Sequence, residues 1–414
     1  MNTDITLQIG IDWADRKHDY CLVGPGWQEP EVGIVSSDPE PLHEWIQSLR
    51  KRFPEGIFEV AVELSRGALV ETLLCYDFVR IYPVNPVSSK RLREALYPSR
   101  RKDDPLDANL ILDILQKHKD HLRPLERGTG EQRLLEGLVK ARRRFVEQRT
   151  RVIQKLTANL KGYYPQALKM AGDIDMPMAR DFLRRWPTFQ ALLKSRPQTL
   201  VRFYHEAGSR SETCIAKRIA VLDSPVAVTD DPVAIELGRM ETLNLVDQLE
   251  TLDANIQRYD TEIQRVYAGL GEKVIFDSLP GAGKVIAPRM LVAFACHAGQ
   301  CQSAGEFAAY AGVAPICQKS GRQCFIGKRL GVPKFLHQTL IEYANWSIGK
   351  SDWARAYYKY RKDVLGQAHW AIMRSLAFKW VRILFRCWET RTPYDEKTYI
   401  ESLKRRGSTL AANL

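Results

Sequence analysis

The sequence predicts an α/β domain at the N-terminus, followed by an all-α part that consists of a helical coiled-coil middle and a mainly helical C-terminal domain. Three patterns support this fold class: short apolar runs alternate with helical spacing at the start of the chain, a heptad repeat occupies the middle, and helical spacing continues to the end. A chain of 414 residues is too long for one ordinary hydrophobic core. We therefore expect an α/β domain at 1–125, coiled-coil helices at 126–268 and a helical domain at 269–414.

The N-terminal region has the pattern of strands joined by helices. Short apolar or β-branched runs predict strands at 7–12, 19–23, 33–35, 58–63 and 78–84. Apolar residues at helical spacing predict helices at 41–51, 67–76 and 104–115. Pro105 lies in the first turn of the last helix, where proline is well tolerated. Strands joined by helices imply a mixed sheet covered by helices.

Two long helices are predicted in the middle region. Apolar residues from Leu134 to Val152 follow a 3–4–7 spacing, and those from Leu245 to Val266 step by alternating fours and threes. The second pattern is a heptad seam, which is typical of a coiled coil. Three arrangements are open: an antiparallel pair, a pair between subunits, or a single helix on its own domain. The insert at about 165–231 indicates no function.

The composition indicates the kind of partner. The net charge is +12, from 61 basic and 49 acidic residues, and this surplus favours a polyanion such as nucleic acid. The eight cysteines form no CxxC pair, and the first residues lack a secretion-signal pattern, so we expect a cytoplasmic protein. No apolar run reaches about 18 residues, so we expect no membrane partner.

Four carboxylates are candidate metal ligands. Asp12 and Glu63 end two predicted strands, while Asp104 and Asp107 share one face at a helix start. Cleavage of a phosphodiester uses magnesium ions about 3.5–4 Å apart, and magnesium prefers oxygen ligands. Carboxylates that converge from several elements supply such ligands. The alternative is that each acid is a helix cap or a solvated surface group.

Basic residues lie beside these acids and along the first long helix. They are candidates for binding a phosphate backbone. Alternatively, the first group balances the charge of the acids, and the second is the solvated flank of a coiled coil. The first group is Lys90, Arg91, Arg93, Arg100, Arg101 and Lys102, and the second is Arg142, Arg143 and Arg144.

A serine in the last third of the chain is a candidate nucleophile. Ser320 lies in a glycine-containing polar loop, near Arg322, Lys328 and Arg329. Such a serine can attack phosphate, although most serines in this setting are turn residues. The stretch Pro280–Lys284 is no nucleotide-binding loop, because it lacks the leading glycine and the final Ser/Thr of that motif.

Several motifs together resemble the insertion sequence 110 family of transposases, in particular its 1111 subgroup. The N-terminal motifs match the Asp-Glu-Asp-Asp signature of that family, and the others match its C-terminal domain. The motifs are Ile9–Asp12, Val62-Glu63, Arg101–Ala108, Leu279–Gly283, Phe307–Pro315, Ser320-Gly321, Phe378–Trp380 and Tyr394.

The resemblance implies a RuvC-like, ribonuclease-H-type fold at the N-terminus. It implies that Asp12, Glu63, Asp104 and Asp107 bind Mg²⁺ or Mn²⁺ and that Ser320 forms a covalent phosphoserine with DNA. It also implies a noncoding bridge RNA that pairs with donor and target DNA. The assembly would be a homo-oligomer, a dimer or tetramer, that acts on DNA in a bacterial or archaeal cell.

The sequence departs from the family pattern at two positions. Asp103 stands directly before Asp104 and is an alternative third ligand, although the three-residue spacing to Asp107 favours Asp104. His337 occupies a position where family members often carry arginine. If that arginine contacts phosphate, the contact made by a histidine is weaker or depends on pH.

The function that follows is RNA-guided DNA cleavage and strand exchange by a transposase. In this hypothesis the carboxylates and Ser320 act on one scissile phosphate, with Arg322 or Lys328 nearby. Two alternatives remain. The first is a metal-dependent junction-resolving nuclease in which Ser320 is structural. The second is a non-catalytic nucleic-acid-binding protein whose acids are structural.

Overall fold

A computed structural model describes most of the chain. The described residues are 5–96, 104–125, 128–223, 225–299, 301–320, 323–327, 329, 331–408 and 410. Only the backbone is described at residues 5–6, 96, 104–105, 296, 317–320 and 323–326. The chain forms two compact units, Met1–Gly128 and Thr129–Leu414. Both long helices and the C-terminal helices belong to the second unit.

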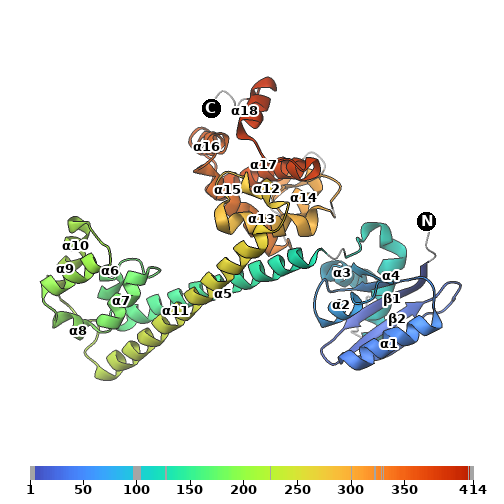
Figure 1. Cartoon of the computed structure of the whole chain (residues 1–414), viewed down its shortest axis with the longest axis horizontal. Helices are drawn as coiled ribbons and strands as arrows, with labels where there is room; N and C mark the ends of the chain where they lie inside the picture. Colours follow the sequence, from blue (N-terminus) through green and yellow to red (C-terminus); the bar gives the residue numbers. More distant parts are fainter. Residues whose placement is uncertain are drawn as a thin grey trace. The chain divides into compact units, whose positions relative to one another are not determined.

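The first unit contains a mixed five-stranded sheet (Figure 1). The sheet order is β3-β2-β1-β4-β5; β1 pairs antiparallel with β2, and β2 with β3, whereas β1, β4 and β5 run parallel. This confirms the predicted α/β fold, with the strand order of a ribonuclease-H-like sheet. The strands are β1 (Ile5–Trp13), β2 (Lys17–Val23), β3 (Glu31–Ser36), β4 (Ile57–Val62) and β5 (Val79–Pro83).

Helices cover both faces of this sheet. The apolar residues of α1 and α2 pack with Ile9, Ile11 and Val60 on one face. Those of α4 pack with Ala61 and Cys21 on the other. One helix, α3, was not predicted, because its sequence is mostly polar. The helices are α1 (Pro39–Arg52), α2 (Ala68–Leu73), α3 (Pro86–Leu96), α4 (Asp104–His118) and the 3₁₀ turn η1 (Lys119–His121).

Two long helices dominate the second unit and lie side by side in Figure 1. Helix α5 (Gly130–Tyr163) pairs with α11 (Pro232–Ala268). Arg142 contacts Asp260 near the start of α5, whereas Asn159 contacts Thr242 near its end. Residue numbers therefore fall along α11 as they rise along α5. Of the arrangements left open by the heptad pattern, the structure has the antiparallel pair within one chain.

The insert between the long helices is a small helical cluster. Its core contains Tyr164, Phe182 and Tyr204, and it closes on Leu160 of α5 and Leu249 of α11. The insert therefore shares its core with the end of α5 and the middle of α11. Its elements are α6 (Gln166–Met170), α7 (Pro177–Arg185), α8 (Phe189–Leu193), α9 (Pro197–Glu206), α10 (Glu212–Ile219) and η2 (Ala220–Leu222).

The C-terminal part is mainly helical, as predicted, and packs around large aromatic side chains. Trp353 and Trp380 are fully buried, and their indole N–H groups donate to Tyr394 Oη at 2.8 Å and Ser347 Oγ at 2.9 Å. Its helical elements are α12 (Lys273–Asp277), α13 (Gly283–Ala298), α14 (Ala304–Tyr310), α15 (Lys334–Ile348), α16 (Asp352–Lys359), the π-helical turn η3 (Tyr360–Val364), α17 (His369–Thr390) and α18 (Glu396–Arg405).

A two-stranded hairpin interrupts these helices. It is formed by β6 (Ile316–Ser320) and β7 (Gln323–Gly327) in antiparallel register. The sequence around Ser320 predicts only a polar loop, because neither strand has a clear alternation of apolar residues. Elsewhere, none of the helices within the described ranges combines the length and apolar character needed to cross a membrane.

Candidate active site

Two of the predicted ligands lie side by side at one edge of the sheet. Ile11 of β1 pairs with Val62 of β4 in parallel register, so Asp12 and Glu63 occupy the next pair of positions. Ile11 and Val62 point toward α1 and α2, where they are buried. Because side chains alternate along a strand, Asp12 and Glu63 project to the opposite face, which α4 covers. Both acids are partly buried.

A third acid reaches this region because α4 crosses β1 at very short range. A Cβ atom built on Gly10 would lie 2.4 Å from both the carbonyl oxygen of Ala108 and the backbone nitrogen of Leu112. Only glycine permits such a close approach of two backbones. Asp107 immediately precedes Ala108, while Asp12 lies two residues beyond Gly10. The glycine therefore brings an acid of α4 toward the acid of β1.

Adding a methyl group at Gly10 should be strongly destabilising. We expect Gly10→Ala to lower the free energy of unfolding by about 1–3 kcal/mol, because backbone atoms of α4 must move away. Scanning calorimetry of the full chain measures this. Gly137→Ala in α5 is the matched control, since nothing lies within 4 Å of its added Cβ and a helical alanine should be neutral or stabilising. Equal melting profiles for the two variants would contradict the close approach.

Helix α3 connects two of the acids. The Ser89 hydroxyl donates to Glu63 Oε1, and the Arg93 guanidinium donates from Nη1 to both carboxylate oxygens of Asp107 at 2.8 Å. Ser89 and Arg93 are four residues apart and share one face of α3. Glu63 and Asp107 therefore face the same stretch of this helix. The contact of Arg93 fits the charge-balancing alternative, whereas Lys90 and Arg91 are exposed.

A carboxylate that the sequence analysis did not select lies beside these acids. Asp19 of β2 is directly opposite Asp12 in the antiparallel register, so the two side chains share a face. Asp19 is buried, and Lys17 Nζ lies 3.4 Å from its Oδ2. In the sequence, Asp19 is marked only by its place in a predicted strand with aromatic and β-branched residues. The pairing of β2 with β1 is needed to show that it lies opposite Asp12.

The fourth predicted ligand is described by its backbone alone. Asp104 begins α4, three residues before Asp107, so the two share a helix face. Asp103, Arg100, Arg101 and Lys102 lie outside the described residues. Among the side chains that the structure does describe, no three from His, Cys, Asp and Glu form a metal-binding group. Asp104 is not one of those side chains.

Two of the three arginines predicted to bind phosphate on the first long helix form ion pairs within the protein, and the third is exposed. Arg142 forms an ion pair with Asp260 of α11, and Arg143 contacts Glu342 of α15 at 3.2 Å. Glu342 also accepts from the buried Arg289 at 2.6 Å. Burial raises the pKa of Glu342, but the hydrogen bond and charge of Arg289, with Arg143, hold it below its ordinary value. Arg144 is exposed.

The candidate nucleophile belongs to the second unit. Ser320 ends β6, and its backbone is paired in register with Gln323 of β7. Arg322 and Lys328 lie outside the described residues, and Arg329 is exposed. His337, the departure from the family pattern, shares a hydrogen bond between its Nδ1 and the carbonyl oxygen of Ala311 at 2.9 Å.

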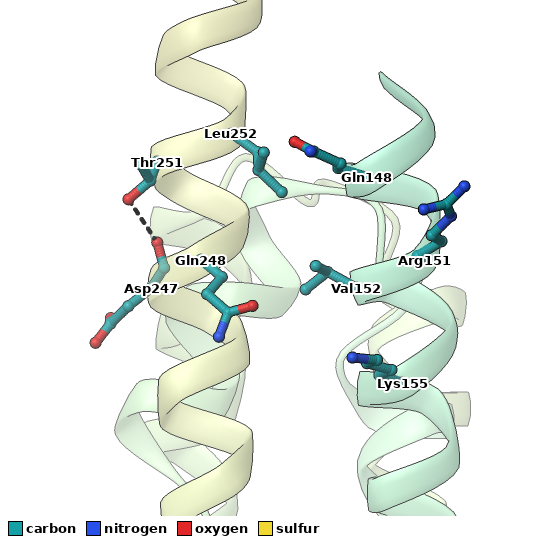
Figure 2. Close-up of a pocket in the computed structure, with 8 residues that line it drawn as sticks. All are labelled: Gln148, Arg151, Val152, Lys155, Asp247, Gln248, Thr251 and Leu252. Atoms are coloured by element: carbon teal, nitrogen blue, oxygen red, sulfur yellow. Dashed lines mark hydrogen bonds between the residues drawn. The ribbon is translucent and has the colours of Figure 1, made fainter. Parts of the chain in front are cut away.

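Figure 2 shows a groove between the two long helices, with a volume of about 500 Å³. Val152 of α5 and Leu252 of α11 point toward each other across it, and Arg151 and Lys155 stand on the α5 side. Its acid, Asp247, is already paired with Arg184. With one acid between basic and apolar walls, this groove does not have the ligands of a magnesium site.

Comparison with known proteins decides the family. Residues 9–165 match a family model described as Transposase, of the DEDD type named for IS110, and residues 274–359 match the model Transposase IS116/IS110/IS902 family. The chain belongs to the IS110 family of transposases. The two matches fall on the acid-bearing sheet with α5, and on the helices around the serine hairpin.

Distant relatives of this IS110-family transposase span nearly the whole chain. The IS117 mini-circle protein of Streptomyces coelicolor is 25% identical over 95% of this chain and 96% of its own. The IS900 42 kDa protein of Mycobacterium paratuberculosis is 25% identical over 94% and 97%, respectively. The IS116 44.8 kDa protein of Streptomyces clavuligerus is 28% identical over 77% and 78%.

The DEDD domain of this IS110-family transposase implies a divalent metal and DNA as the substrate. The described residues fit such an ion in their chemistry. Asp12 and Glu63 are neighbours on parallel strands, and Asp107 faces the same helix as Glu63. All three present carboxylate oxygens, the ligands that magnesium and manganese accept.

Proposed function

We propose that this IS110-family transposase cleaves and exchanges DNA strands under the guidance of a noncoding RNA, with Ser320 as the nucleophile. One observation carries the metal-dependent part of the proposal: Asp12 and Glu63 are adjacent on parallel strands, and α3 contacts both Glu63 and Asp107. The RNA guide and the serine nucleophile rest on the resemblance of the sequence motifs to the family. Acids from separate elements that lie close together repel one another, so their proximity favours a bound cation in addition to Arg93, which pairs with Asp107.

The metal ligands in this proposal are Asp12, Glu63, Asp104 and Asp107. A bound divalent metal would polarise the scissile phosphate and stabilise developing negative charge. The contacts of Ser89 and Arg93 orient Glu63 and Asp107, as second partners of metal ligands commonly do. Asp103 is the alternative to Asp104.

The covalent chemistry belongs to the serine. Oγ of Ser320 forms a bond to phosphorus while the bond from phosphorus to one bridging DNA oxygen breaks. The serine proton is lost, and the departing DNA oxygen takes up a proton. In the second step a DNA hydroxyl attacks the phosphoserine, and Ser320 leaves and regains its proton. Each step replaces one phosphoester bond with another, so the exchange needs no nucleotide hydrolysis.

The acids and the serine lie in different compact units of the chain, Met1–Gly128 and Thr129–Leu414. A complete site therefore requires the two units to meet on one phosphate, either within a chain or between chains. We propose a homo-oligomer, a dimer or tetramer, in which subunits share the work. The net charge of +12 favours binding of both DNA and the guide RNA through their phosphates.

The test starts from the purified full chain and the RNA that accompanies it. We expect this RNA to match DNA that flanks the gene, and we expect cleavage of a DNA carrying the element's ends to stop after RNase or EDTA treatment. Adding back the synthetic RNA, or Mg²⁺, should restore cleavage. Metal-dependent cleavage of branched DNA that is unaffected by RNase would contradict RNA guidance and favour the junction-resolving nuclease.

A further inference from the structure

Three aromatic rings, two of them exposed and one partly buried, form a ledge where α16, η3 and α17 meet. This aromatic ledge consists of Tyr358, His369 and Trp370. The ring centroids of His369 and Trp370 are 5.1 Å apart, and those of Tyr358 and His369 are 5.8 Å apart, both in edge-to-face geometry. The hydroxyl of Tyr358 lies 3.1 Å from Nδ1 of His369. The rings therefore support one another in a fixed arrangement.

The outermost ring of the aromatic ledge is available to a partner. Trp370 is 66% exposed, although α17 buries Ile372, Met373 and Trp380 on its inner face. Val364 and Leu365, in the segment just before α17, are also exposed. A large indole left in water beside other apolar groups is typical of a binding surface. The neighbouring π-helical turn is itself a feature often found at functional sites.

Cations surround the aromatic ledge. Lys362 Nζ lies 5.6 Å from the centre of the Tyr358 ring, and Lys359 and Lys362 are both exposed. On α17, burial and then the charges of Arg361 and Arg382 lower the pKa of Lys379, whose Nζ lies 5.1 Å from the centre of the Tyr357 ring. Asp363 is the acid of this turn. The two exposed lysines therefore place positive charge next to the Tyr358 ring.

We propose that the aromatic ledge stacks against an unpaired base of single-stranded DNA while Lys359 and Lys362 contact its phosphates. Exposed aromatic rings beside lysines are what single-stranded nucleic acid requires, because every base has a stacking face and every linkage carries a charge. An acidic protein segment would match the cations but would leave the indole unused. This inference rests on the proposed function, since strand exchange leaves DNA bases temporarily unpaired.

The binding experiment uses the full chain and a fluorescent 20-nucleotide oligothymidylate, followed by anisotropy. We expect Trp370→Ala to weaken binding by roughly 10-fold, because one stacked base loses its aromatic partner. Trp370→Phe should retain most of the affinity. Lys362→Gln should weaken binding and reduce its dependence on salt concentration.

Trp346→Ala is the matched control, because Trp346 is another exposed indole, at 62%, on α15. It should bind the oligothymidylate like the wild type. The proposal is overturned if Trp370→Ala binds the oligothymidylate like the wild type. It is likewise overturned if the substitution lowers the affinity for double-stranded DNA as much as the affinity for the oligothymidylate. It is also overturned if only oligouridylate binding changes, which would make RNA the partner. The measurement involves neither DNA cleavage nor a guide RNA, so its result can be distinguished from a failure of the proposed function.

Discussion

Replacing Asp12 by Asn together with Glu63 by Gln will abolish DNA cleavage, with a loss of about 10³-fold or more. The two side chains are neighbours on parallel strands, so the double change removes two of the negative charges at this edge of the sheet. Loss of one electrostatic contact at a transition state already costs about 10²–10³-fold in rate. The measurement is cleavage of DNA carrying the element's ends, at several concentrations of Mg²⁺ and Mn²⁺.

The matched control is Glu40→Gln, which changes an exposed acid on α1 of the same unit and should leave cleavage intact. DNA binding by the double variant should persist, because its net charge becomes more positive. Full cleavage by the double variant would show that these acids are structural, as the non-catalytic alternative requires. Lost binding together with a lowered melting temperature would show a folding defect instead.

We expect Ser320→Ala to prevent formation of the covalent protein–DNA adduct that the proposed mechanism requires. Removal of an enzyme's nucleophile commonly costs several orders of magnitude in rate, because no other group takes over the covalent step. The adduct is measured as a band of protein and labelled DNA that survives denaturation, and mass spectrometry of the digested adduct should place the phosphate on Ser320. DNA binding should remain at the level of the wild type.

Ser48→Ala is the control for this experiment, since Ser48 is an exposed serine on α1. It should form the adduct normally. If Ser320→Ala cleaves DNA at the wild-type rate without any adduct in either protein, the enzyme is a nuclease that uses water. If Ser320→Ala still forms the adduct, another residue is the nucleophile.

Local patterns in the sequence were sufficient for most of the fold. Period-2 and helical spacing predicted all five strands of the sheet and both long helices, because each of these elements buries one apolar face. Helix α3 and the β6–β7 hairpin were missed. The first is mostly polar, with Leu92 as its half-buried apolar residue, and the second depends on pairing between strands rather than on periodicity.

The candidate site was less accessible to sequence reasoning because its geometry is non-local. Asp12 and Glu63 are neighbours because of the register in which β1 pairs with β4. Asp107 comes toward Asp12 because α4 crosses β1 closely at Gly10. Likewise, Arg142 appeared suited to phosphate until the antiparallel partner helix placed Asp260 opposite it. In each case the decisive neighbour is distant along the chain.

The hairpin-like course of α5 and α11 has an evolutionary consequence for the segment between them. Tyr163 at the end of α5 lies against Gly238 near the start of α11, so the chain leaves and returns at nearly the same point. Additional residues could accumulate there without disturbing either partner helix. Removal of the whole insert would expose Leu160 and Leu249 to solvent. A relative that lacks the insert would therefore need polar residues at these two positions.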